Sequence, residues 1–117
     1  METLEDWLRE LKASGRQIIV EGKNDKKALV EIGIPEEKIT ELDRPLFEVV
    51  ENIAKVHKQV IILTDLDAEG KKLYRELNNS FQNLGIRIDH EFREFLFKET
   101  QLSHIEGIST YFRTHGL

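Results

Sequence analysis

The sequence has 117 residues, a length that suits one domain with one hydrophobic core. It has 39% hydrophobic and 33% charged residues and no cysteine, which excludes disulfides, thiolate metal sites and zinc knuckles. The formal net charge of −5 at pH 7 argues against a broad basic footprint for nucleic acid, but it is compatible with a local basic rim around an acidic site.

The expected location follows from two absences in the sequence. No apolar run approaches the ~20 residues that a membrane-spanning helix needs. The first residues, 1–6, are acidic and lack the basic and then apolar layout of a signal peptide. We therefore expect a cytoplasmic protein that does not contact a membrane.

The N-terminal residues are predicted to form an amphipathic helix over 2–14, because apolar residues recur on one face of it. Thr3 suits the N-cap position of this helix, and Gly15 suits the position just past its end. Trp7 lies on the apolar face, so packing in the core or an interface is favoured for it over stacking on a base.

The first predicted strand covers 16–20. It is followed by the motif Glu21-Gly22-Lys23-Asn24-Asp25. Gly22 permits a tight turn, and Asp25 is predicted to cap a helix over 25–33. Lys23 lies close to the start of that helix, where its charge opposes the helix dipole. Contact with a phosphate and a position facing solvent are therefore equal alternatives for Lys23.

A short strand over 38–42 and a helix over 45–57 are predicted next. The apolar spacing of this helix places Val56 on its inward face. Arg44 lies just after the short strand, at the end of the sheet where ligands are expected. Holding a phosphate and pairing with an acidic residue are equal alternatives for Arg44.

The central stretch begins with Val60–Leu63, four apolar residues that predict a strand buried on both faces. It continues into the motif Asp65-Leu66-Asp67-Ala68-Glu69-Gly70. A helix over 69–84 is predicted to follow. Crowded carboxylates repel one another, and a cation with a preference for oxygen ligands, such as Mg²⁺, relieves that repulsion. The pair Asp65 and Asp67 is therefore predicted to bind a metal ion, although capping of the helix is an equal alternative for Asp67 alone.

A fourth strand over 86–90 and a tail of one or two helices over 91–113 complete the predicted elements. Nothing in this topology needs the wide apolar face of the tail, which is therefore a candidate surface for a homodimer or a protein partner. A basic edge is predicted from Arg87, Arg93 and Lys98. No two of the four histidines have metal-ligand spacing on one helix; they are His57, His90, His104 and His115.

The order of the elements predicts one α/β domain over 1–117, with a parallel sheet covered on both faces. The two motifs, each directly after an apolar strand, resemble those of the Toprim domain, and the resemblance covers 16–90. Toprim domains occur in type IA and type II topoisomerases, bacterial-type primases, recombination mediators, overcoming-lysogenization-defect nucleases and the ribonuclease that matures 5S ribosomal RNA. The resemblance implies a Rossmann-like three-layer sandwich with a mostly parallel four-stranded sheet. The whole chain is most similar to the small stand-alone Toprim proteins.

The resemblance also implies roles for the carboxylates. Glu21 would be the general acid/base or a metal ligand, and Asp65 and Asp67 would be the metal ligands. Glu69 matches an acidic position of the topoisomerase version and would be a supporting ligand. The implied cofactor is Mg²⁺, with Mn²⁺ as the alternative.

Three basic residues lie close to these motifs or to the expected ligand-binding edge. These residues, Lys23, Arg44 and Lys71, are the candidate phosphate-binding residues.

The first functional hypothesis is Mg²⁺-dependent phosphoryl transfer on RNA or DNA, as in a nuclease. The second is a non-catalytic nucleic-acid or nucleotide-binding module that works with partner proteins. The third is an unrelated acidic-loop α/β domain, such as a phosphate-signalling receiver. Topoisomerase and primase activities are not expected, because they need a tyrosine nucleophile on another domain or a zinc-binding region.

Overall fold

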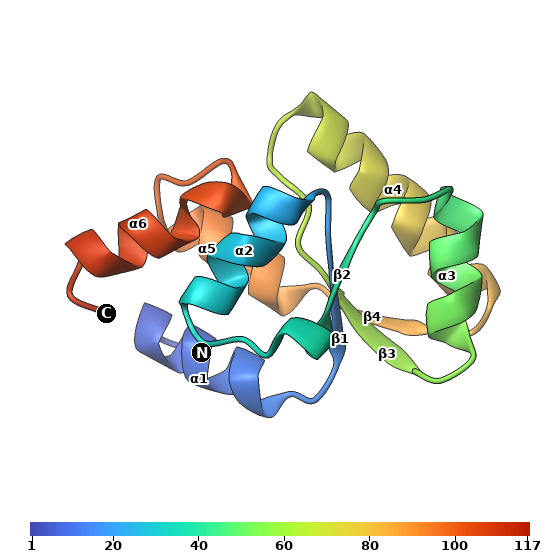
Figure 1. Cartoon of the computed structure of the whole chain (residues 1–117), viewed down its shortest axis with the longest axis horizontal. Coiled ribbons are helices and arrows are strands. Elements are labelled where there is room, and N and C mark those ends of the chain that lie inside the picture. The colour runs from blue at the N-terminus through green and yellow to red at the C-terminus, as the bar shows by residue number, and fades with distance from the viewer.

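A computed structural model describes all residues, 1–117, as a four-stranded sheet with helices on both faces (Figure 1). The strands are β1 (Gln17–Val20), β2 (Ile39–Glu41), β3 (Gln59–Ile62) and β4 (Arg87–Asp89). Their order is β2-β1-β3-β4, and every neighbouring pair is parallel. The carboxyl ends of all four strands therefore lie at one edge of the sheet, and the predicted α/β sandwich is confirmed.

Six α-helices and two short 3₁₀ helices connect and cover the strands. They are α1 (Leu4–Ala13), α2 (Lys23–Glu31), α3 (Leu46–Ala54), α4 (Ala68–Asn83), α5 (Glu91–Glu99) and α6 (Ile108–Thr114), with η1 (Glu36–Lys38) and η2 (Ile105–Gly107). None of these helices combines the length and the apolarity that crossing a membrane requires.

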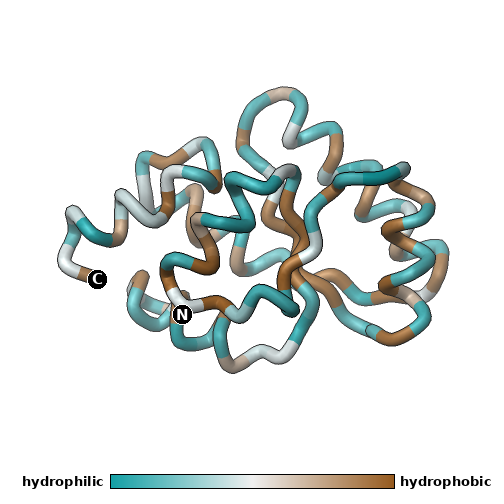
Figure 2. The backbone as a smooth tube through the Cα atoms, viewed as in Figure 1, coloured by the Kyte–Doolittle hydropathy of each residue, from teal (hydrophilic) through white to brown (hydrophobic).

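The two middle strands each begin with a half-buried glutamine and continue as three buried apolar residues, because both of their faces are covered (Figure 2). Ile18 and Ile61 point to the side of the sheet that α1, α2, α5 and α6 cover. Ile19 and Ile62 point to the other side, which α3 and α4 cover. Successive side chains of a strand alternate between the faces, so each four-residue strand contributes to both cores.

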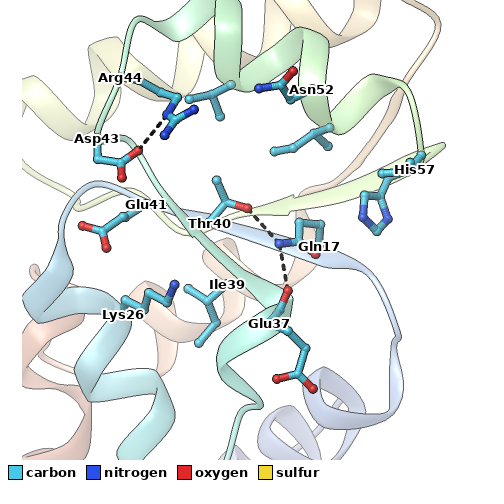
Figure 3. A pocket seen from close by; sticks show the side chains of 13 residues that line it. Gln17, Lys26, Glu37, Ile39, Thr40, Glu41, Asp43, Arg44, Asn52 and His57 are labelled. Atoms are coloured by element: carbon cyan, nitrogen blue, oxygen red, sulfur yellow. Dashed lines mark hydrogen bonds and ion pairs between the residues drawn. The ribbon is translucent and has the colours of Figure 1, made fainter.

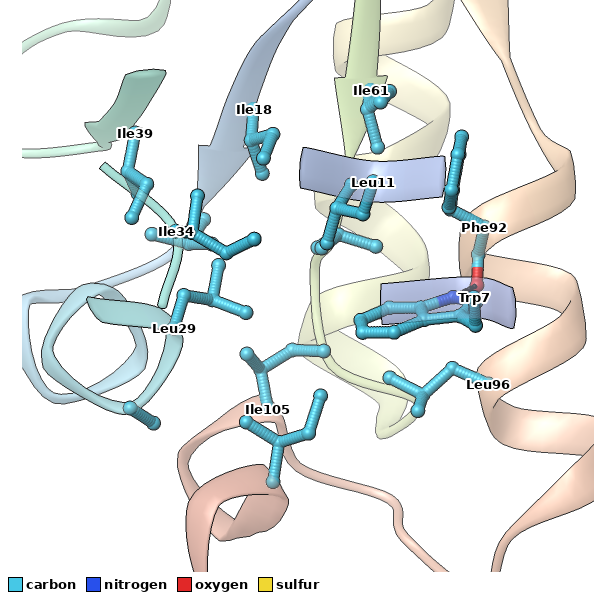
Figure 4. Packing of buried hydrophobic residues seen from close by; sticks show 14 of the residues in the cluster. Trp7, Leu11, Ile18, Leu29, Ile34, Ile39, Ile61, Phe92, Leu96 and Ile105 are labelled. Carbon is cyan, nitrogen blue, oxygen red and sulfur yellow. Dashed lines mark hydrogen bonds between the residues drawn. The ribbon is translucent and has the colours of Figure 1, made fainter. Parts of the chain in front are cut away.

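Trp7 lies in the core. Packing in the core was one of the two roles that the sequence favoured for it, and an interface was the other. Its side chain is fully buried, and its indole N–H donates to the Phe92 carbonyl oxygen at 2.8 Å. The rings of Phe92 and Phe112 meet its ring edge-on, with centroids 6.2 and 5.9 Å away (Figure 4 shows the contact with Phe92).

The tail was proposed as a partner surface because nothing in the predicted topology needed its wide apolar face, and that reason was wrong. Four residues of its apolar face, Leu96, Ile105, Ile108 and Phe112, are buried against α1, α2 and the sheet of the same chain. The topology does need this face, because α1 and α2 alone leave part of the sheet uncovered.

Two local predictions were also wrong. Helix α2 begins at Lys23, so Gly22 is its N-cap and Asp25 lies three residues further on. The Asp25 carboxylate reaches back to accept the Gly22 N–H at 3.1 Å, which is half of a capping box. Helix α3 ends at Ala54, and Val56 is 75% exposed in the turn before β3 instead of pointing inward.

Candidate metal centre

The ends of β1 and β3 bring Glu21 next to Asp65. The two strands are parallel neighbours, with Ile19 opposite Ile62. Glu21 Oε2 accepts a hydrogen bond from the Asp65 N–H at 2.6 Å. Burial raises the pKa of Glu21, although that hydrogen bond opposes the shift, and the negative charges of Asp65 and Asp67 raise it further. Glu21 is therefore a carboxyl group that holds a proton more readily than an ordinary glutamate.

Asp67 begins helix α4 and keeps one carboxylate oxygen free of the helix. It is the N-cap residue, and its Oδ1 accepts the Gly70 N–H at 2.8 Å. Its Oδ2 lies 3.3 Å from Nε2 of His104. Capping and metal binding were treated as alternatives for Asp67, but its two oxygens allow both.

His104 is the member of the site that the sequence did not indicate. It lies in the loop between α5 and η2, far along the chain from both motifs, and no spacing rule connects it with Asp67. The next residue, Ile105, donates its N–H to Asp65 Oδ1 at 2.8 Å. Asp65, Asp67 and His104 each offer a ligand atom, and these atoms lie within 4.8 Å of one another.

The donor set fits a divalent cation. Two carboxylates and one imidazole converge, and their side chains remain partly open to solvent. Carboxylate oxygens suit Mg²⁺ and Mn²⁺, and imidazole is a common ligand of transition ions. Asp65 and Asp67 would hold the ion, with His104 beside them.

Arg93 supports the aspartate loop, which is the segment 63–67 between β3 and α4 that carries Asp65 and Asp67. Its guanidinium donates to the carbonyl oxygens of Thr64 at 2.9 Å and Asp65 at 2.7 Å. It also stacks over the rings of Tyr74 and Phe97, at 4.7 and 5.4 Å from their centroids. The sequence placed Arg93 on a basic surface edge, but the side chain is half-buried, and burial lowers its pKa.

Glu69 and the candidate phosphate-binding residues lie outside the group of converging ligand atoms. Glu69 and Lys71 are exposed in the first turn of α4, and Lys23 is exposed at the start of α2. Arg44 pairs with Asp43 at 3.5 Å and lines a pocket of about 450 Å³ beside the edge strand β2 (Figure 3). The acidic partner foreseen as one alternative for Arg44 is therefore present.

Comparison with known proteins gives the family. Residues 16–95 match the Toprim domain. The chain belongs to the Toprim domain family. Relatives named UPF0292 protein include one from Methanosarcina barkeri, 35% identical over 116 residues (95% of this chain, 81% of that protein). Another, from Methanocaldococcus jannaschii, is 30% identical over 115 residues (94% of this chain, 90% of that protein).

A solved structure shares the whole Toprim architecture. It is a protein from Aquifex aeolicus with 34% sequence identity and a TM-score of 0.84, and the match covers 92% of this chain and 100% of that one. Toprim domains generally bind divalent metals and are associated with functions on nucleic acid. The family and the cluster of ligand atoms together support a metal-related role for this Toprim chain.

Asp25, the last residue of the first Toprim motif, is the most strongly perturbed acid near the site. Its side chain is buried, and burial raises its pKa from 3.8 to about 6, with further repulsion from Asp65 and Glu106. Its carboxyl group lies beside the Gly22 N–H that it accepts. The folded protein therefore holds a proton on Asp25 that the unfolded chain releases at lower pH.

The contribution of Asp25 to the stability of the metal-free protein is expected to fall as the pH rises from 3.8 to about 6. In that window the folded state binds more protons at Asp25 than the unfolded state, so ionisation of Asp25 favours unfolding. Asp25→Asn keeps an oxygen for the Gly22 N–H and removes this cost. We expect it to be more stable than wild type by about 1–2 kcal/mol at about pH 7, and about equally stable near pH 4. Urea unfolding at several pH values in a chelator measures this difference, and a difference independent of pH would contradict the assignment.

Proposed function

We propose that this chain is a divalent-metal-dependent phosphoryl-transfer protein that acts on nucleic acid in the manner of a nuclease. The observation that carries the proposal is the meeting of Glu21, Asp65 and Asp67 at the carboxyl ends of two neighbouring parallel strands. That edge is where open α/β sheets bind ligands. Phosphoryl transfer needs positioning and charge neutralisation more than covalent chemistry by the protein, which suits such a site.

Each residue of the centre has a distinct task in this proposal. Asp65 and Asp67 hold the ion, which when bound neutralises the charge that develops on the phosphoryl oxygens. The raised pKa of Glu21 suits a general acid that gives a proton to the leaving oxygen. Lys23 and Lys71, exposed at the starts of α2 and α4, contact the phosphates on either side.

Cleavage assays on short single-stranded RNA and DNA test the proposal. Wild type is expected to cleave one of them with Mg²⁺ or Mn²⁺, and Asp65→Asn/Asp67→Asn to lose both cleavage and metal binding by calorimetry. Glu21→Gln keeps an oxygen that accepts the Asp65 N–H. It is therefore expected to bind metal normally and to cleave about 10²–10⁴-fold more slowly. Asp43→Asn, at an exposed aspartate outside the centre, is the matched control and should behave as wild type.

The outcomes separate the functional hypotheses. Metal binding without cleavage of either nucleic acid by wild type would contradict the nuclease and favour a binding module. Equal metal binding by wild type and the double variant would contradict the metal centre itself. Loss of metal binding in Glu21→Gln would make Glu21 a ligand instead of the general acid.

A further inference from the structure

The loop that carries His104 is fastened to the aspartate loop on both sides of the histidine. The Ser103 carbonyl oxygen accepts the Leu66 N–H at 2.8 Å. On the other side, the Ile105 N–H donates to Asp65 Oδ1 at 2.8 Å. These two bonds fix the backbone of His104 directly beside the second Toprim motif. A surface histidine without a role needs no such double attachment.

The imidazole ring is also held in orientation. Its Nδ1 is hydrogen-bonded to the Ser103 hydroxyl at 3.0 Å, and its Nε2 faces Asp67 Oδ2 at 3.3 Å. A histidine that binds a metal commonly uses its second ring nitrogen in a hydrogen bond, which fixes the tautomer. With the proton on Nδ1, donated to Ser103, the lone pair of Nε2 points to the side where Asp65 and Asp67 offer their oxygens.

Each of the two aspartates uses one carboxylate oxygen in a local hydrogen bond and keeps the other available for a metal ion. Asp67 Oδ1 and Asp65 Oδ1 accept backbone N–H groups. The second oxygen of each carboxylate has no hydrogen bond within the chain. Asp67 Oδ2 lies 3.3 Å from Nε2 of His104, and Asp65 offers a carboxylate oxygen within 4.8 Å of the ligand atoms of the other two residues. The centre therefore offers two oxygens and one nitrogen.

We infer that His104 is a third ligand of the metal centre and that it shifts the preference of the site from Mg²⁺ toward a transition-type ion such as Mn²⁺. Mg²⁺ takes oxygen ligands almost exclusively, whereas imidazole suits divalent transition ions, and Mn²⁺ is the transition ion that shares the preference of Mg²⁺ for carboxylates. The inference rests on the proposed metal centre and adds the ion that the centre selects.

Calorimetric titration of metal-free protein with Mn²⁺ and with Mg²⁺ tests this inference. His104→Ala is expected to lower the Mn²⁺ affinity by more than about tenfold and the Mg²⁺ affinity by less than about twofold. His104→Asp replaces the nitrogen by oxygen and is expected to lower the ratio of Mn²⁺ to Mg²⁺ affinity below that of wild type. His57→Ala removes an imidazole before the amino end of β3, at the opposite edge of the sheet, and is the matched control.

A spectroscopic measurement on wild type does not depend on any variant folding. Pulsed electron paramagnetic resonance of the Mn²⁺-loaded protein is expected to detect coupling to a histidine nitrogen, and His104→Ala should abolish it. Unchanged Mn²⁺ affinity in His104→Ala, or no nitrogen coupling in wild type, would overturn the inference and leave His104 as an ion-pair partner of Asp67. If Asp65→Asn/Asp67→Asn still loses metal binding in that case, the proposed centre stands. If the double variant binds metal as wild type does, the centre itself is wrong.

Discussion

Gly70→Ala is expected to destabilise the protein by about 3 kcal/mol and to abolish metal binding. A Cβ at Gly70 would lie 2.1 Å from the Asp65 carbonyl oxygen, 2.6 Å from its carbonyl carbon and 2.8 Å from its nitrogen. These are backbone atoms, so no side-chain rotation relieves the overlap. Helix α4 must move away from the aspartate loop, and the bonds from Thr64 to the Gly70 carbonyl and from Gly70 to Asp67 break with it.

Thermal unfolding and calorimetry with Mn²⁺ measure the two effects of Gly70→Ala. Gly22→Ala makes the same change in the first motif and is the matched control. Gly22 has extended backbone with φ −147°, and a Cβ there would meet only the Asp25 carboxylate, at 3.9 Å. We expect the control to cost about 1 kcal/mol at most, as alanine is a poorer N-cap than glycine. A Gly70→Ala protein with the melting temperature and metal affinity of wild type would show that α4 can shift without disturbing Asp65.

The sequence was sufficient for the fold because its signals are local. Val60–Leu63 and Ile18–Val20 are short apolar runs, each bounded by a motif that turns the chain, and each is followed by apolar residues at helical spacing. Parallel strands buried on both faces have this appearance. The motifs also indicated which carboxylates lie at the shared edge, because each motif follows the end of a strand closely.

The rest of the site could not be predicted, because it depends on where the tail packs. His104 and Arg93 belong to the segment after β4, and only the packing of α5 and η2 brings them to the aspartates. The tail was interpreted as a candidate surface for a homodimer or a protein partner, so neither residue was connected with the centre. Asp25 was predicted as a helix cap because its type suits that position, but its burial depends on the contact between α2 and η2.

Arg93→Ala is expected to lower the free energy of unfolding by about 2–4 kcal/mol. The change removes two hydrogen bonds from a charged donor and leaves the Thr64 and Asp65 carbonyl oxygens at the end of β3 without partners. It also removes the stacking on Tyr74 and Phe97. The variant also no longer has the cost of desolvating the half-buried Arg93 charge, and this gain offsets part of the loss. Because the Asp65 backbone is no longer held, Mn²⁺ affinity is expected to fall by about tenfold.

Arg93→Lys separates charge from geometry in this prediction. An ammonium group keeps the positive charge near Glu21 and Asp65 but lacks the planar fork that reaches two carbonyl oxygens at once. If the fork matters, Arg93→Lys should lose most of the stability that Arg93→Ala loses, and if only charge matters it should resemble wild type. Arg87→Ala, at an exposed arginine of β4, is the matched control and should stay within about 0.5 kcal/mol of wild type. Urea unfolding of the three variants decides between these results. A stable Arg93→Ala protein with normal Mn²⁺ affinity would mean that the aspartate loop holds its shape without Arg93, through its hydrogen bonds with Glu21, Gly70, Ser103 and Ile105.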